Sequence, residues 1–172
     1  MECGQRFSAS CIPTGQGAGR FDVPDLTPVW YLAETPAHAV AEILQGLRNQ
    51  PLDINDLIRF GRPLALVRVT LDPAQLLDLC DPEILSHHNI RPDALAAWDF
   101  TRTHAIARQL YGAECVGFRW WSALSGDWHS SVVFHEKLTE DQLIFGDPEP
   151  LTLRSPAIVE AAKRLAITLV SE

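Results

Sequence analysis

Three residues near the start of the chain could act together, because their side chains have complementary chemistry and regular spacing. Arg20, Tyr31 and Glu42 each lie eleven residues apart. A guanidinium binds phosphate oxygens as a planar fork, and a tyrosine ring stacks on a cation. A carboxylate stabilises positive charge that develops in a transition state. Side chains of these three types could therefore bind an anion, stack on a cation and stabilise developing positive charge.

The segments around these residues predict a different element for each. Arg20 falls in a glycine-rich loop, "CIPTGQGAGRF" (11–21), and Tyr31 in a strand, "PVWYLA" (28–33). A helix over 36–49 should carry Glu42, since Thr35 is a good N-cap and Pro36 suits the first helical position. The sequence therefore orders the trio as loop arginine, strand tyrosine and helix glutamate.

The helical wheel of 36–49 separates an apolar stripe from a polar face. The stripe contains Val40, Ile43, Leu44 and Leu47. Glu42 lies roughly opposite, on a face that it shares with His38, Gln45 and Asn49. Taken alone, that pattern predicts that Glu42 faces solvent. Taken alone, Arg20 would be a solvated loop arginine and Tyr31 a common strand residue.

The later segments predict an α+β fold. The run at 63–71, "PLALVRVTL", is apolar enough for a strand covered on both faces. A helix is predicted over 91–112, then strands over 115–120 and 130–136, and a weaker strand over 142–146. A last amphipathic helix should begin at Ser155-Pro156 and run through Leu165 and Leu169. Without regular βαβ alternation, we expect one domain over 1–172, with a mixed sheet and flanking helices.

Composition excludes several classes of function. The chain has 172 residues, 47% of them hydrophobic, and a formal net charge of −8, with no basic cluster that would bind nucleic acid. The residues from Met1 onward lack the basic and apolar pattern of a signal peptide, and no apolar run approaches about 20 residues, so we expect neither a signal peptide nor a membrane span. The cysteines at 3, 11, 80 and 115 form no CxxC pair, so we expect reduced thiols and a cytoplasmic protein. The histidines lack acidic or thiol ligands at matching spacing, so no metal site is expected.

The motifs around the trio resemble those of a known family. The chain contains "GRF" (19–21), "YLA" (31–33), "AVAE" (39–42), "VGFRWWSAL" (116–124) and "SSVVF" (130–134). In this order they resemble the RES domain, a toxin family named after its arginine, glutamate and serine, over roughly residues 5–135. "QRF" supplies the early pair Arg6 and Phe7, where the family often has tyrosine in place of Phe7. Trp121 precedes Ser122 where the family commonly has a small residue or proline, so Ser130 or Ser131 is the alternative serine.

The resemblance implies a fold, a substrate and a partner. Members look like ADP-ribosyltransferases in fold and cut the nicotinamide–ribose bond of NAD+, by hydrolysis or with inorganic phosphate as co-substrate. They are toxins that an antitoxin with an Xre-type helix-turn-helix holds in check. By the same resemblance Arg20, Glu42 and Ser122 are catalytic, and Arg6, Phe7 and Tyr31 join them in binding NAD+. No other cofactor and no metal is implied.

Two other functions remain open at this level. The same site could transfer ADP-ribose to a macromolecule. Alternatively, the chain could be a non-catalytic binding module that uses four of its five tryptophans, Trp98, Trp120, Trp121 and Trp128, although we expect these four in the core. The sequence leaves the acceptor and any homo-oligomer undecided.

Overall fold

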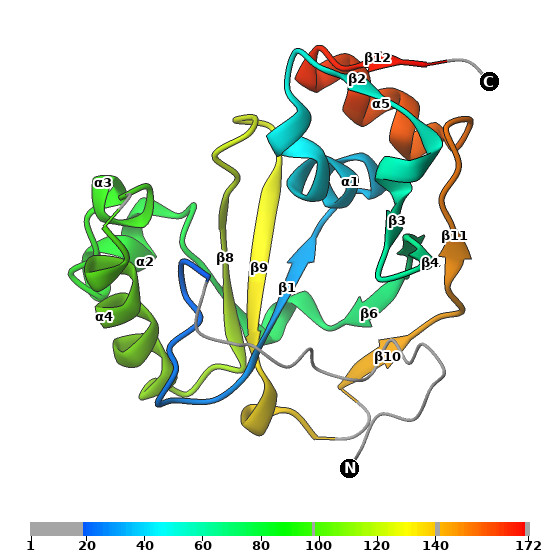
Figure 1. The fold of residues 1–172 in the computed structure, drawn as a ribbon. Coiled ribbons are helices and arrows are strands. Elements are labelled where there is room, and N and C mark those ends of the chain that lie inside the picture. Colours follow the sequence, from blue (N-terminus) through cyan, green and yellow to red (C-terminus); the bar gives the residue numbers. More distant parts are fainter. Residues whose placement is uncertain (1–18, 98, 140–141, 171–172) are drawn as a thin grey trace. The chain divides into compact units, whose positions relative to one another are not determined.

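The chain folds as two compact units that are interleaved in the sequence. A computed structural model describes residues 19–97, 99–139 and 142–170. Unit 1 comprises Met1–Leu32 and Val69–Phe145, and unit 2 comprises Ala33–Arg68 and Gly146–Glu172. Each unit therefore combines two separate stretches of chain (Figure 1). The prediction of one domain over 1–172 stays a prediction.

Unit 1 is built on a four-stranded sheet in the order β1-β9-β8-β7. Its strands are β1 (Val29–Ala33), β7 (Leu76–Asp78), β8 (Gly117–Trp121) and β9 (His129–Phe134). β8 pairs antiparallel with β9 and parallel with β7. The mixed sheet predicted from the sequence is thus confirmed. Three of its four strands, β1, β8 and β9, lie at segments predicted as strands.

Helices of unit 1 lie beside β8 (Figure 1). They are α2 (Pro82–His87), α3 (Pro92–Leu95) and α4 (Phe100–Tyr111). The prediction of one helix over 91–112 is wrong, because the helix is interrupted: α3 ends at Leu95 and α4 begins at Phe100. The Asp99 carboxylate accepts a hydrogen bond from Thr101 N at 2.9 Å, which caps α4 as a new helix. Apolar side chains of these helices and the sheet form one core cluster.

Short elements complete unit 1. They are β6 (Val69–Leu71), paired antiparallel with β10 (Leu143–Phe145), and the 3₁₀ turns Pro73–Gln75 and His135–Lys137. Gly117, at the start of β8, is required by close packing. A Cβ there would lie 2.1 Å from the carbonyl oxygen of Val132 on β9. The small residue lets the two strands of the central pair approach each other.

Unit 2 pairs α1 (Pro36–Leu44) with α5 (Pro156–Leu165). Its strands are short: β2 (Pro51–Leu52) is parallel to β12 (Thr168–Leu169), and β5 (Ala65–Leu66) is antiparallel to β11 (Glu149–Pro150). The strands β3 (Ile58–Arg59) and β4 (Arg62–Pro63) form a hairpin, and 3₁₀ turns occupy Gln45–Leu47 and Ile54–Leu57. None of the helices in the described residues is long and apolar enough to cross a bilayer.

Three predictions for these segments are wrong in detail. The run 63–71 is not one strand, because β4, β5 and β6 pair with three different partners. Ile43 is 49% exposed, since the buried face of α1 is rotated toward Ala37 and Ala41. The last helix ends at Leu165 because Ala166 turns left-handed, with φ 54°.

Candidate active site

The "GRF" segment is anchored by its phenylalanine. Phe21 is fully buried, and its ring lies edge-on to those of Phe118 and Trp120, with centroids 5.0 and 4.7 Å away. The main-chain N–H of Phe21 donates to the Tyr31 hydroxyl at 2.8 Å. A Cβ at Gly19 would lie 2.6 Å from that hydroxyl. Glycine is therefore needed at position 19 for the loop to pack against Tyr31.

Tyr31 keeps its proton while exposing its ring. The residue is 45% exposed, but its hydroxyl end packs against Gly19 and Phe21. This local burial raises the Tyr31 pKa to about 12, and the Asp22 charge acts in the same direction against the opposing effect of the Phe21 N–H and Arg20. The side chain thus offers a neutral phenol and an accessible aromatic face.

Arg20 is tied to the break between α3 and α4. Its Nη1 donates to the carbonyl oxygens of Leu95, at 3.2 Å, and Ala97, and its guanidinium carbon lies 5.9 Å from the ring centroid of Phe100. Leu95 is the last residue of α3 and Ala97 lies just beyond it. Carbonyl oxygens at a helix C-terminus lack intrahelical partners. Within the described residues, the Nε and Nη2 donors of Arg20 make no hydrogen bond, so one side of its fork is open to a ligand.

Ser122 immediately follows β8 and closes a tight turn. It is 7% exposed, its N–H donates to Trp128 O at 2.8 Å, and its Oγ accepts from Leu124 N at 3.1 Å. This local bond is the ordinary role expected of a strand-end serine. The alternative serines, Ser130 and Ser131, lie within β9 and are also buried.

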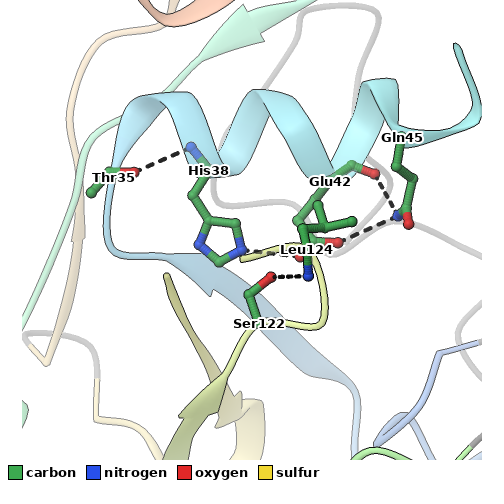
Figure 2. A network of polar contacts seen from close by, with 6 residues as sticks. All are labelled: Thr35, His38, Glu42, Gln45, Ser122 and Leu124. Carbon is green, nitrogen blue, oxygen red and sulfur yellow. Dashed lines mark hydrogen bonds and ion pairs between the residues drawn. The ribbon is translucent and has the colours of Figure 1, made fainter. Parts of the chain in front are cut away.

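Glu42 is on α1, with its carboxylate engaged by neighbours on the same helix. His38 Nε2 lies 3.0 Å from Glu42 Oε1, and the Gln45 amide approaches Oε2 at 3.4 Å (Figure 2). The Glu42 side chain is 39% exposed, whereas that of His38 is fully buried. The expectation that this face is simply solvated is therefore wrong for His38.

The predicted residues fall into three groups. Unit 1 brings Arg20 and Tyr31 together, and it carries Ser122 directly after β8, a strand of the sheet that contains Tyr31. Glu42 belongs to unit 2, so its convergence with Arg20 stays a prediction. Arg6 and Phe7, like Trp98, lie outside the described residues. Of the remaining tryptophans, Trp120 and Trp128 are buried as expected and Trp121 is half-buried.

Two histidines that contact the segments of the candidate site were not predicted from the sequence. His38 could have been found, because it lies four residues before Glu42 and i, i+4 side chains meet on a helix. His104 on α4 lies 3.1 Å from the Gly19 carbonyl oxygen through its Nε2. No local pattern signals that contact, since 85 residues separate the two.

The geometry agrees with a family assignment. The RES domain family model matches residues 5–154, so the chain belongs to the RES domain family. The chain is also 32% identical over 98 residues to the protein named "Probable NAD(+) phosphorylase Rv3189" from Mycobacterium tuberculosis. That alignment covers 57% of this chain and 45% of the relative, so the chain spans under half of the relative's length.

A solved structure shares the fold. It is a chain in the crystal structure of the M. tuberculosis MbcT–MbcA toxin–antitoxin complex, with a TM-score of 0.56 and 19% sequence identity. The match covers 85% of this chain and 76% of that one. At this identity the likeness concerns the fold, and the expected α+β architecture is confirmed.

Proposed function

We propose that the chain cleaves the nicotinamide–ribose bond of NAD+. The observation that carries the proposal is the carboxylate of Glu42, held on α1 by His38 at 3.0 Å and partly exposed. Membership of the RES family and the name of the mycobacterial relative, an NAD+ phosphorylase, support NAD+ as the substrate.

The reaction places positive charge where a carboxylate can stabilise it. The bond between the anomeric carbon and the nicotinamide nitrogen breaks, and its electron pair neutralises the pyridinium. The ribose then has oxocarbenium character until an oxygen of water or inorganic phosphate bonds to the anomeric carbon. Water yields ADP-ribose and a proton, whereas phosphate yields a sugar phosphate. Glu42 stabilises the sugar's charge more strongly as the reaction proceeds, so its effect is on the rate.

The residues of unit 1 serve as the binding side of the site. The open side of the Arg20 fork binds pyrophosphate oxygens, since its Nη1 is already engaged by main-chain carbonyls. The exposed face of Tyr31 stacks on the cationic nicotinamide ring, which is worth about 0.5–2 kcal/mol. Ser122 fixes the substrate's pose and is not a nucleophile. Arg6 and Phe7 complete the predicted NAD+ contacts.

The partner we propose is an antitoxin with an Xre-type helix-turn-helix. Support comes from the shared fold with a chain of a toxin–antitoxin complex. Expression of the chain alone should stop bacterial growth while cellular NAD+ falls, and co-expression of the antitoxin should restore both. Sustained growth with a constant NAD+ pool at high expression would contradict the toxin role.

The activity is tested with purified protein and NAD+, with and without inorganic phosphate, by following nicotinamide chromatographically and other products by phosphorus NMR. We expect nicotinamide release. A phosphate-dependent rate and a new sugar phosphate identify phosphorolysis, while ADP-ribose without phosphate dependence identifies hydrolysis. Transfer of label from NAD+ to protein would favour ADP-ribosyl transfer instead. Intact NAD+ after prolonged incubation would leave a binding module and overturn the proposal.

A further inference from the structure

Two side chains contact the carboxylate of Glu42: His38, which lies on α1 and is completely buried, and Gln45, which caps the end of α1. His38 Nε2 lies 3.0 Å from Oε1, with 0% of the His38 side chain exposed. Gln45 Nε2 donates to the main-chain oxygen of Glu42 at 2.9 Å and contacts Oε2 at 3.4 Å. Figure 2 shows His38 and Gln45 on opposite sides of Glu42 along the helix.

The sequence of α1 determines this arrangement. Helical side chains lean toward the N-terminus, so the long Glu42 side chain reaches the residue four positions earlier. Thr35 Oγ1 accepts a hydrogen bond from His38 N at 3.2 Å, which fixes the backbone of His38 in the first turn. Burial then restricts the imidazole to a narrow range of orientations. Both the backbone position and the ring orientation of His38, whose Nε2 contacts Glu42, are therefore fixed.

The two carboxylate oxygens of Glu42 are not equivalent. An ionised carboxylate only accepts hydrogen bonds, so the imidazole donates from Nε2 to Oε1. The contact of Oε2 with Gln45 is at the long limit for a hydrogen bond. Oε1 is therefore engaged by a buried donor at 3.0 Å, a closer contact than that of Oε2 with Gln45.

We propose that His38 is a positioning residue for Glu42, an inference that rests on the proposed role of Glu42 in NAD+ cleavage. By holding Oε1, His38 fixes the rotamer and the plane of the carboxylate before NAD+ binds. A preorganised group does not reorganise during the reaction. A displacement of about 1 Å in such a site can cost about a hundredfold in rate.

The test compares kcat, the KM for NAD+ and the unfolding temperature of full-length variants. His38→Leu should lower kcat about tenfold or more while the KM for NAD+ stays within about twofold. His38→Gln, which keeps an amide donor, should recover part of the lost kcat. His87→Leu is the control, because His87 is exposed on α2 and should leave all three quantities unchanged.

A double mutant separates positioning from a general effect on the helix. Aspartate at position 42 is too short to reach His38, so His38→Leu should lower kcat no further in the Glu42→Asp background. An equal loss in both backgrounds would overturn the proposal. So would an unchanged kcat in His38→Leu, even with a lower unfolding temperature, because that is the result of a purely structural role.

Three further outcomes are distinguishable. If His38→Leu does not fold, His38→Asn replaces it, because the asparagine amide is polar but too short to reach Oε1 of Glu42. An unchanged kcat in His38→Asn would overturn the proposal. If the wild-type chain releases no nicotinamide, the proposed function itself fails. If Glu42→Gln is inactive while the His38 variants match the wild type, only the inference about His38 fails.

Discussion

At the scale of single residues, the chemistry depends on how side chains are held as much as on which ones are present. Glu42 would be an ordinary helical glutamate without the buried imidazole at 3.0 Å. Tyr31 would be an ordinary strand tyrosine without the glycine and the main-chain N–H that enclose its hydroxyl. In both cases a neighbour converts a common residue into one with a fixed orientation.

The first prediction concerns the charge of Glu42. Glu42→Gln should reduce NAD+ turnover to background, because the amide cannot stabilise the developing cation on the ribose. The unfolding temperature should change little, since the side chain is partly exposed. Glu160→Gln is the matched control, because Glu160 is exposed on the surface of α5. Retained turnover in Glu42→Gln would remove the residue from the catalytic machinery.

The second prediction concerns the contact between Gly19 and Tyr31. Gly19→Ala should raise the KM for NAD+, because the new methyl group would stand 2.6 Å from the Tyr31 hydroxyl and displace the ring. Gly46→Ala serves as its control, since a Cβ at Gly46 meets nothing within 4 Å. Equal KM values for the two alanine variants would show that the orientation of Tyr31 does not matter for binding.

The third prediction is a pH effect. The chain has two tyrosines, Tyr31 and Tyr111. Burial raises the pKa of Tyr31 to about 12 from 10.0. Because the folded pKa lies above the unfolded one, this contribution to stability is complete below pH 10 and declines as the pH rises toward 12. Phenolate absorbance should show a step near pH 12 that Tyr31→Phe removes. Titration of Tyr31 near pH 10 would contradict the buried hydroxyl.

At the scale of elements, local signals predicted where segments begin better than how far they extend. Thr35 caps α1 as expected, and a strand occurs where "PVWYLA" indicated one. The sequence pattern did not predict that 91–112 forms two helices or that 63–71 is divided among three short strands. Both failures have a physical reason. A cap such as Asp99 competes with an otherwise helical pattern, and apolar runs do not reveal that successive residues pair with different strands.

The fourth prediction separates two roles of Arg20: its hydrogen bonds to the carbonyls between α3 and α4, and its proposed contact with the pyrophosphate of NAD+. Arg20→Ala should raise the KM for NAD+ and also lower stability, because the carbonyls of Leu95 and Ala97 lose their donor. Asp99→Ala removes the cap of α4, at about 1 kcal/mol, without touching the proposed phosphate contact. If the Asp99 variant raises the KM as much as Arg20→Ala does, the effect of Arg20 on binding is indirect.

At the scale of the whole molecule, the family motifs predict the site residues but do not show whether these residues lie close together. Arg20 and Tyr31 are brought together within unit 1, because Phe21 packs into the core and its N–H donates to the Tyr31 hydroxyl. Glu42 belongs to the other unit, and its even spacing from Arg20 in the sequence carries no information about distance in space. The net charge of −8 is compatible with the function because local arginines are sufficient for a single dinucleotide.

The central claim is that Arg20 and Glu42 act on one and the same NAD+ molecule. A crystal structure of Glu42→Gln with NAD+ bound tests it most directly, because the variant should bind the substrate without consuming it. We predict the Arg20 guanidinium within hydrogen-bonding distance of the pyrophosphate and the side chain at position 42 beside the nicotinamide ribose. An NAD+ molecule that contacts one of these residues and lies far from the other would contradict the account.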